Sequence, residues 1–167
     1  MIAATRRPAE IYVVSPGGRS APGGISRMVD YFMSEWEQQK RLPSLTLIDS
    51  YGTRGKWHIP AYFLGAFCRV LLDGGLGRIA VLHLHTAERG SVVRKGMFIL
   101  LARMLRIPTV VHMHGAEFAD FYQALPSVLR RLVSAVFRLA DRCIARPTQG
   151  EGRTDQGTDS QGEDHTA

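Results

Sequence analysis

Five short apolar runs rich in β-branched residues alternate along the chain with four longer segments that carry apolar residues at helical spacing. Such runs are typical of buried strands, and segments of roughly ten to fifteen residues between them are typical of helices. Strands that alternate with helices pair in parallel, because each helix returns the chain to the start of the next strand. The sequence therefore predicts an α/β fold with a doubly wound parallel sheet. The expected strands are residues 9–15, 45–50, 79–85, 109–114 and 141–145, and the expected helices are residues 25–39, 62–72, 91–105 and 127–139.

The length and composition are those of one soluble globular domain. The chain has 167 residues, of which 45% are hydrophobic and 22% are charged, so it can build one core and hardly two. The N-terminus lacks the apolar stretch of a signal peptide, and no segment is long and apolar enough to cross a bilayer. Cys68 and Cys143 both lie in apolar runs. We therefore expect buried, reduced thiols in a cytoplasmic protein.

Charge and composition change near residue 147. Residues 1–147 hold 20 Lys and Arg against 10 Asp and Glu, a net charge of +10, whereas residues 148–167 hold one Arg against five acids, a net charge of −4. The positive part favours anionic partners such as nucleotide phosphates or acidic lipid headgroups. The C-terminal segment is almost without apolar residues and cannot bury enough surface to fold. We expect one domain over residues 1–146 and a disordered polar tail over residues 147–167.

A glycine-rich loop, SPGGRSAPGG, joins the first expected strand to the first expected helix. Glycine lets the backbone approach a phosphate closely, and the following helix offers N–H donors and a partial positive charge. Gly23 and Gly24 directly precede that helix, and we expect them to bind an anion. The loop is too long for the dinucleotide fingerprint G-x-G-x-x-G, although Asp49 ends the second strand where a ribose-binding acid would be expected. A plain flexible connection and NAD binding both stay open as alternatives.

Two histidine pairs end two successive expected strands, His83 with His85 and His112 with His114. Residues at i and i+2 of a strand share one face, and ligands of parallel sheets bind at the carboxyl ends of the strands. We expect His85 and His114, the last residues, to line a cleft, and His83 and His112 to be satisfied core residues. No carboxylate joins the histidines at ligand spacing, so we expect no metal site.

The segment AERGSVVRKG places cations around the start of an expected helix. Ser91 can cap this helix, Arg89 precedes it, and Arg94 and Lys95 lie in its first two turns. Cations at a helix N-terminus oppose the helix dipole. An anionic ligand and a solvated basic face explain them equally well. Trp57, in a loop with neighbouring cations, could touch a membrane surface.

Taken together, these stretches resemble the N-terminal domain of a GT-B-fold glycosyltransferase of family 4. The likeness runs from about Ile11 to Ala145 and is carried by IYVVSPGG, PGGISRMVDYF, LHLHTAERGSVVRKGMF, HMHGAEFADFY and ADRCIA. It implies a Rossmann-like domain that mainly holds the acceptor and faces a second domain that holds the nucleotide-sugar donor. It also implies retaining transfer of a hexose from a UDP- or GDP-sugar to a polysaccharide or lipid-linked acceptor. Neither a cofactor nor an obligatory metal belongs to that reaction.

The resemblance also implies roles for single residues. Gly23 and Gly24 would approach the donor diphosphate or an acceptor phosphate. His114, with the backbone of Gly115, would face the transferred sugar and is the expected catalytic residue. The expected substrate-binding residues are Gly23, Gly24, His85, Arg89, Ser91, Arg94, Lys95, Gly115 and Glu117.

The sequence departs from this family pattern near residue 146. Family members continue into a further helix and a second domain with an E-x7-E glutamate pair, and neither that motif nor a second βαβ series follows here. The abrupt change would suit a truncated or frameshifted gene. We therefore expect the chain to lack the donor-binding half and to be inactive alone. A separate donor domain is a possible partner.

An alternative of another class is a non-catalytic basic module that docks on an anionic membrane or on a separate partner domain. We expect either protein in the cytoplasm, at most peripheral at the inner face of the plasma membrane. Scattered arginines without a recognisable module argue against nucleic acid as a partner. A small NAD-dependent or metal-dependent enzyme is a third hypothesis, based on Asp49 and the histidine pairs.

Overall fold

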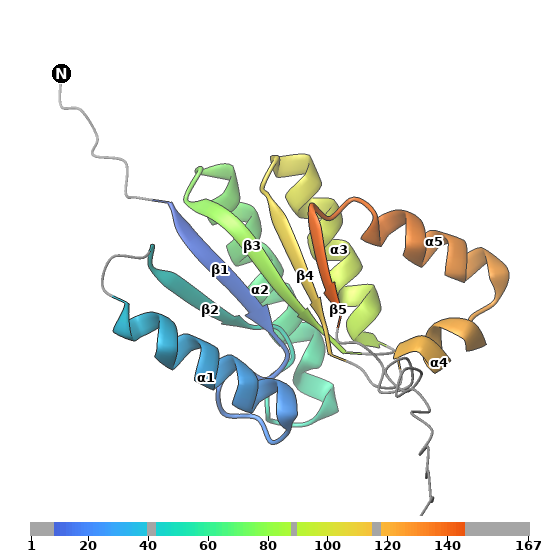
Figure 1. Cartoon of the computed structure of the whole chain (residues 1–167), viewed down its shortest axis with the longest axis horizontal. Helices are drawn as coiled ribbons and strands as arrows, with labels where there is room; N and C mark the ends of the chain where they lie inside the picture. The colour runs from blue at the N-terminus through green and yellow to red at the C-terminus, as the bar shows by residue number, and fades with distance from the viewer. Residues whose placement is uncertain (1–8, 40–42, 88–89, 115–117, 146–167) are drawn as a thin grey trace, which may run out of the picture.

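The computed structural model describes residues 9–39, 43–87, 90–114 and 118–145. In this part of the chain, five parallel strands form one sheet in the order β2-β1-β3-β4-β5, with helices on both faces (Figure 1). The predicted α/β fold with a doubly wound, Rossmann-like parallel sheet is confirmed. The strands are β1 (Glu10–Ser15), β2 (Leu45–Asp49), β3 (Ile79–Thr86), β4 (Thr109–Met113) and β5 (Arg142–Ala145).

Helices follow each of the first four strands, with two in succession after β4. They are α1 (Gly24–Gln38), α2 (Ile59–Gly75) after the 3-10 turn η1 (Lys56–His58), α3 (Gly90–Leu105), α4 (Phe118–Ala124) and α5 (Ser127–Phe137). The sequence pattern did not predict the short helix α4. It also ended α2 too early, before Gly74 and Gly75. Gly74 lies inside the helix. A Cβ at this position would come within 2.7 Å of Ile107 and 2.9 Å of Leu105, so the glycine is needed for close packing and does not end the helix.

The order of the strands places a topological switch point beside β1. The chain passes from β1 to β2 on one side, and then crosses to β3 on the other side of β1. In open parallel sheets of this kind, ligands bind in the crevice at the carboxyl ends of the strands where the order reverses. Ser15 ends β1 and His85 and Thr86 end β3, so these residues border the switch point.

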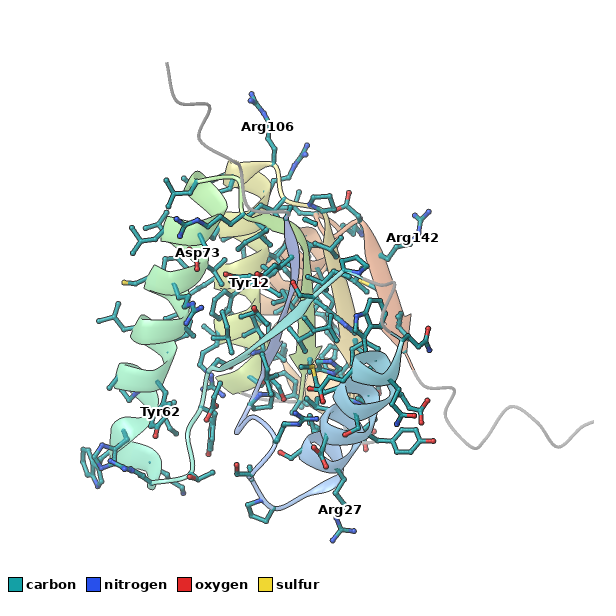
Figure 2. The ribbon with its side chains drawn as sticks, turned by 90° about the vertical axis from the view of Figure 1, so that its left-hand side faces the viewer. Tyr12, Arg27, Tyr62, Asp73, Arg106 and Arg142 are labelled. Carbon is teal, nitrogen blue, oxygen red and sulfur yellow. The ribbon has the colours of Figure 1, made fainter. Side chains whose placement is uncertain are left out.

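The two faces of the sheet are packed very differently. One face carries the main core, in which Val14, Leu82 and Val111 of the strands pack with Phe98 of α3 and with α2 and α5. On the same face, Tyr12 donates a hydrogen bond to Asp73 of α2 at 2.9 Å (Figure 2). The other face carries α1 and a second cluster whose buried members are Val13, Val29 and Met33.

The cysteines correct one expectation from the sequence. Cys68 and Cys143 are both free, but both are exposed and not buried. Cys68 lies on the outer side of α2, and Cys143 lies on β5, the edge strand of the described sheet. An apolar neighbourhood in the sequence thus did not translate into burial. Within the described ranges, no helix has the length and hydropathy needed to span a bilayer.

Candidate functional site

The glycine-rich loop after β1 is held in place by the carboxylate that ends β2. Asp49 Oδ1 accepts hydrogen bonds from the backbone N–H groups of Gly17 at 2.8 Å, Tyr51 at 2.8 Å and Gly52 at 2.9 Å. Three amides on one carboxylate oxygen tie the loops after β1 and β2 together. Asp49 therefore has a structural task here, which gives its position at the strand end a reason other than binding a ribose.

The glycines of this loop differ in backbone conformation and in the space around them. Gly17 has φ +80°, and a Cβ on it would collide with Ala21, so the loop itself requires glycine there. Gly23 has φ +127° and precedes α1 as its N-cap, without a side-chain cap and without an acidic residue in the first turn. Nothing lies within 4 Å of a Cβ built on Gly23 or Gly24. The two predicted glycines thus face open space at the positive end of a helix dipole.

The two histidine pairs form one cluster on the α1 face of the sheet, which we call the histidine cluster (His83, His85, His112 and His114). His85 and His112 are directly opposite each other in the register of β3 and β4. His85 Nδ1 lies 2.8 Å from His114 Nε2, a hydrogen bond between the two residues predicted to share the cleft. His83 stacks parallel to His112 with ring centroids 6.1 Å apart, and Phe32 of α1 meets His83 edge-on at 5.9 Å.

Burial within the cluster differs from the expected division into core and cleft. His85, expected to line a cleft, is 1% exposed, whereas His83, His112 and His114 are half-buried. His83 was expected to be satisfied, yet its Nε2 is buried with no hydrogen-bond partner among the described residues, and the same holds for Nε2 of His85. The prediction failed because strand position alone does not tell how much of the sheet face α1 covers.

The whole cluster is neutral at pH 7. Burial lowers the pKa of His83 and His114 to about 4, with neighbouring imidazoles contributing in the same direction. Burial and the other three rings lower the pKa of His85 further, to about 2, and burial also lowers the pKa of His112. Neutral imidazoles keep a free lone pair, so these rings can accept hydrogen bonds or bind a metal ion.

A buried lysine lies at the start of α3, on the opposite face of the sheet. Lys95 is 1% exposed, donates a hydrogen bond to Ser50 Oγ at 2.7 Å, and lies 5.5 Å from the ring centre of Phe98. Burial, together with the nearby Arg94, lowers its pKa to about 7. The alternative of a solvated basic face is therefore wrong for Lys95.

The other predicted residues around α3 have local partners. Arg94 is half-buried and lies 5.2 Å from the ring centre of Tyr51. Ser91 is buried and its Oγ accepts a hydrogen bond from the N–H of Ala87 at 3.2 Å. Arg89 lies outside the described residues, and so do Gly115 and Glu117 beyond β4.

Several polar residues at the strand ends were missed by the sequence analysis. Ser15 and Thr86 are fully buried, and their hydroxyl oxygens have no hydrogen-bond partner among the described residues. Ser50 holds Lys95 and lies directly after β2. A usable signal was present, because each of these hydroxyls ends or follows a strand at the edge where ligands bind.

Comparison with protein families supplies the context for this geometry. Residues 3–153 match the family model described as glycosyl transferase 4-like domain. Comparisons with curated proteins and with solved structures gave no match. The matched range covers most of the chain and all of the strands and helices described above. The chain therefore belongs to the glycosyl transferase 4-like domain family.

Proposed function

We propose that this domain forms the acceptor-side wall of a retaining glycosyltransferase. The donor would be a UDP- or GDP-linked hexose, and the acceptor a polysaccharide or a lipid-linked glycan. The observation that carries the proposal is the meeting of three features at one edge of the sheet. These are the N-terminus of α1, whose backbone N–H groups can bind an anion, the hydrogen-bonded pair His85–His114, and the switch point between β1 and β3. The chain that carries them belongs to a glycosyl transferase family.

The start of α1 is suited to a phosphate. Gly23 and Gly24 have open space above their Cα atoms, and the helix behind them has no acid in its first turn to compete with an anion. Backbone N–H groups at a helix N-terminus bind phosphate oxygens without a positive side chain. Such donors also stabilise the charge that develops on a departing diphosphate.

His114 is suited to positioning a sugar hydroxyl. Its ring is half-buried and keeps one nitrogen, Nδ1, besides the Nε2 that bonds to His85. With its pKa lowered to about 4, the ring stays neutral and can donate or accept one hydrogen bond without repelling an oxocarbenium-like centre. His85 then acts as a positioning residue that fixes the orientation of His114.

The two cations of α3 would contribute to acceptor binding in different ways, because they differ in burial. Arg94 is partly accessible and can reach an anionic acceptor directly, whereas Lys95 is covered and acts through Ser50 and the local field. Arg89, Gly115 and Glu117 complete the proposed set by resemblance.

A sugar cleft needs two walls to exclude water, and this sheet supplies one. We therefore expect the 167-residue chain to bind diphosphate groups weakly and to show no sugar transfer by itself. Titration with inorganic pyrophosphate, UDP and GDP, followed by amide NMR, would test the binding. Incubation with UDP- and GDP-sugars and a product assay would test the transfer.

One substitution separates ligand binding from folding. Gly24→Ala places a methyl group where nothing lies within 4 Å, in a backbone conformation that alanine adopts readily, so the fold should be unaffected or slightly stabilised. It should nevertheless weaken pyrophosphate binding, because the methyl group occupies the space of the ligand. Gly75→Ala at the end of α2 is the matched control, since a Cβ there also meets nothing within 4 Å. Equal pyrophosphate affinity in both variants would refute the assignment of the α1 start, and robust transfer by the chain alone would refute the single-wall argument.

A further inference from the structure

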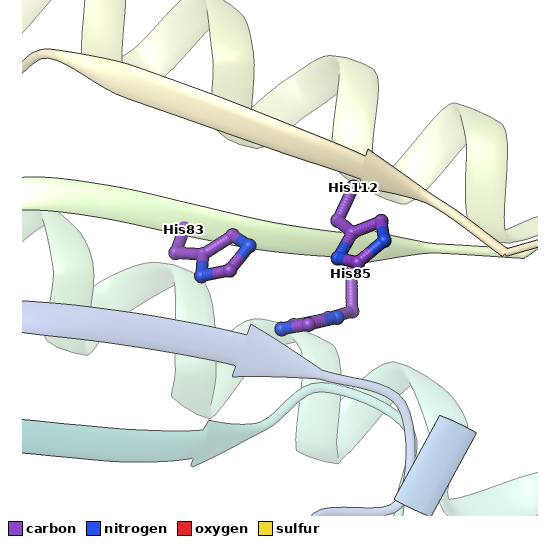
Figure 3. A group of neighbouring side chains, drawn as sticks. All are labelled: His83, His85 and His112. Atoms are coloured by element: carbon purple, nitrogen blue, oxygen red, sulfur yellow. The ribbon is translucent and has the colours of Figure 1, made fainter. Parts of the chain in front are cut away.

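The histidine cluster holds more ring nitrogens close together than the proposed transfer reaction requires. Of its four rings, His83, His85 and His112 each offer a ring nitrogen, and these three atoms lie within 4.8 Å of one another (Figure 3). His83 and His85 come from β3 and His112 comes from β4. These two strands are hydrogen-bonded to each other, so they hold all three residues in fixed positions. Sites on rigid elements hold ligand geometry more tightly than sites on loops.

Two of these nitrogens lack a partner where a partner is expected. Nε2 of His83 and Nε2 of His85 are buried without a hydrogen bond to any described residue. A buried polar atom left unpaired destabilises the folded chain, so two in one cluster need an explanation. Because His85 is 1% exposed, bulk water does not readily satisfy its Nε2.

The hydrogen bond between His85 and His114 suits a metal ligand. When His85 Nδ1 carries the hydrogen and donates it to His114 Nε2, the lone pair of His85 Nε2 is left bare. Metal-binding histidines commonly donate their second ring N–H to a neighbour in this way, which fixes the tautomer and the ring orientation. In the other tautomer, His85 Nε2–H would be a buried donor without an acceptor.

We propose that His83, His85 and His112 form a binding site for a divalent transition-metal ion of the zinc or copper type, with His114 as the hydrogen-bonding partner that orients His85. Three imidazoles without a carboxylate favour Zn²⁺, Cu²⁺ or Ni²⁺ over Mg²⁺, Ca²⁺ or Mn²⁺. Ligand distances of about 2.0–2.1 Å require tetrahedral nitrogens roughly 3.4 Å apart, so nitrogens that are now up to 4.8 Å apart close in by up to about 1.4 Å on binding.

The site would keep one coordination position for an exchangeable ligand. His112 and His114 are half-buried, so solvent reaches the cluster from the β4 side. Ser15 ends β1, one residue beyond the Val14–Leu84 pair of the β1–β3 register, and therefore lies beside His85. Its buried hydroxyl has no partner among the described residues and could bind a metal-bound water. A fourth, non-protein ligand is a common feature of three-histidine sites.

The site can be tested by metal binding alone, without any sugar transfer. The chain would be prepared without an affinity tag, stripped with a chelator, and carry Cys68→Ser and Cys143→Ser, because both thiols are exposed and thiolates are metal ligands in general. Calorimetric titration with Zn²⁺ and absorption spectra with Co²⁺ should give one ion per chain in a tetrahedral nitrogen environment. Mg²⁺ should not compete, and Zn²⁺ should raise the melting temperature.

Matched variants locate the ion. His112→Ala removes a half-buried ligand and should weaken Zn²⁺ binding by at least about tenfold, and His114→Ala should weaken it by about 10–100-fold through the orientation of His85. The control variant combines His58→Ala with His165→Ala, the two histidines outside the cluster, and should bind Zn²⁺ like the parent. Circular dichroism identifies any variant that fails to fold, and His83→Gln then replaces it.

Each outcome decides the proposal. Single-site binding that falls in the cluster variants and persists in the control supports it. No binding by the parent at millimolar Zn²⁺, binding that survives His112→Ala, or binding that the control variant loses would overturn it. None of these results depends on the proposed transferase function, which is tested by pyrophosphate binding at Gly24.

Discussion

The two faces of the sheet differ in what packs on them and in what their strands carry. The face toward α2, α3 and α5 is lined by apolar side chains such as Val14, Leu84 and Val111, all without exposed surface. Among the described residues, the buried apolar members of the face toward α1 are Val13, Val29 and Met33, and β3 and β4 present the histidine cluster there. The imidazoles are therefore gathered on the thinly packed face.

One face therefore packs the main core and the other carries the histidine cluster. The well-packed face fixes the positions of the strands, and the strands in turn fix the rings on the other face. Lys95 and Tyr12 nevertheless place buried titratable groups on the well-packed side. Substitutions on the two faces should accordingly have unequal effects on stability.

The largest difference is expected between two phenylalanines. Phe98 is fully buried on the α3 side and contacts Phe63 and Phe67, with ring centroids 5.6 and 5.7 Å away, whereas Phe32 on α1 is only half-buried. Phe98→Ala should lower the free energy of unfolding by about 3–5 kcal/mol, because it leaves a cavity that cannot collapse. Phe32→Ala should lower it by about 1–2 kcal/mol. Urea denaturation of both variants measures the two values.

Phe98→Leu is the conservative control for this pair and should recover much of the loss. If Phe32→Ala were as destabilising as Phe98→Ala, the α1 face would contribute a core of its own, and the contrast between the faces would fail. Equal m-values in all variants would show that the comparison concerns the folded state.

The next prediction concerns Lys95. Because its pKa in the folded chain is about 7, below the usual 10.5, the unfolded chain binds more protons between these two values. The free energy of unfolding should therefore rise with pH above about 7. Lys95→Met removes the buried ammonium and should raise the free energy of unfolding at pH 7 by about 1–4 kcal/mol, while abolishing this pH slope. Denaturation at pH 7, 8 and 9 measures both effects.

Lys56→Met is the matched control, since Lys56 is exposed, and it should leave stability and slope as in the parent chain. Destabilisation by Lys95→Met at pH 7 would mean that the bond to Ser50 outweighs the cost of burying the charge. The buried lysine would then stabilise the well-packed side and not weaken it.

The same contrast explains which features could be predicted from the sequence. The strands were predicted within about a residue, because apolar runs and helical spacing are local properties of the chain. His85 and His114 were predicted to be the last strand residues; each lies within one residue of a strand end, and their rings are hydrogen-bonded. The burial of Lys95 and the unpaired Nε2 of His83 depend on which helix covers which face, and the bond from Gly17 to Asp49 depends on the pairing of β1 with β2. Such tertiary relations leave no trace in a local pattern.

The smallest expected effect concerns the charges that hold the outer side of α1. Arg19, in the loop before the helix, bonds to Asp30 at 2.7 Å, to Glu37 at 3.1 Å and to Ser34 at 3.1 Å. These groups are exposed, so Arg19→Ala should lower the free energy of unfolding by less than about 1 kcal/mol, and added salt should reduce even that. Urea denaturation at low and high NaCl measures the effect.

Arg27 provides the control, because it points away from the domain (Figure 2) and has no ion pair within the described part of the chain. Arg27→Ala should therefore be neutral at either salt concentration. A loss of more than about 2 kcal/mol in Arg19→Ala, well above the usual range for exposed pairs, would show that α1 is held by its charges. In that case the thin packing of the α1 face would be compensated by electrostatics, and high salt would loosen the helix that covers the histidine cluster. A small loss means instead that Val29 and Met33 suffice to hold α1 on the sheet.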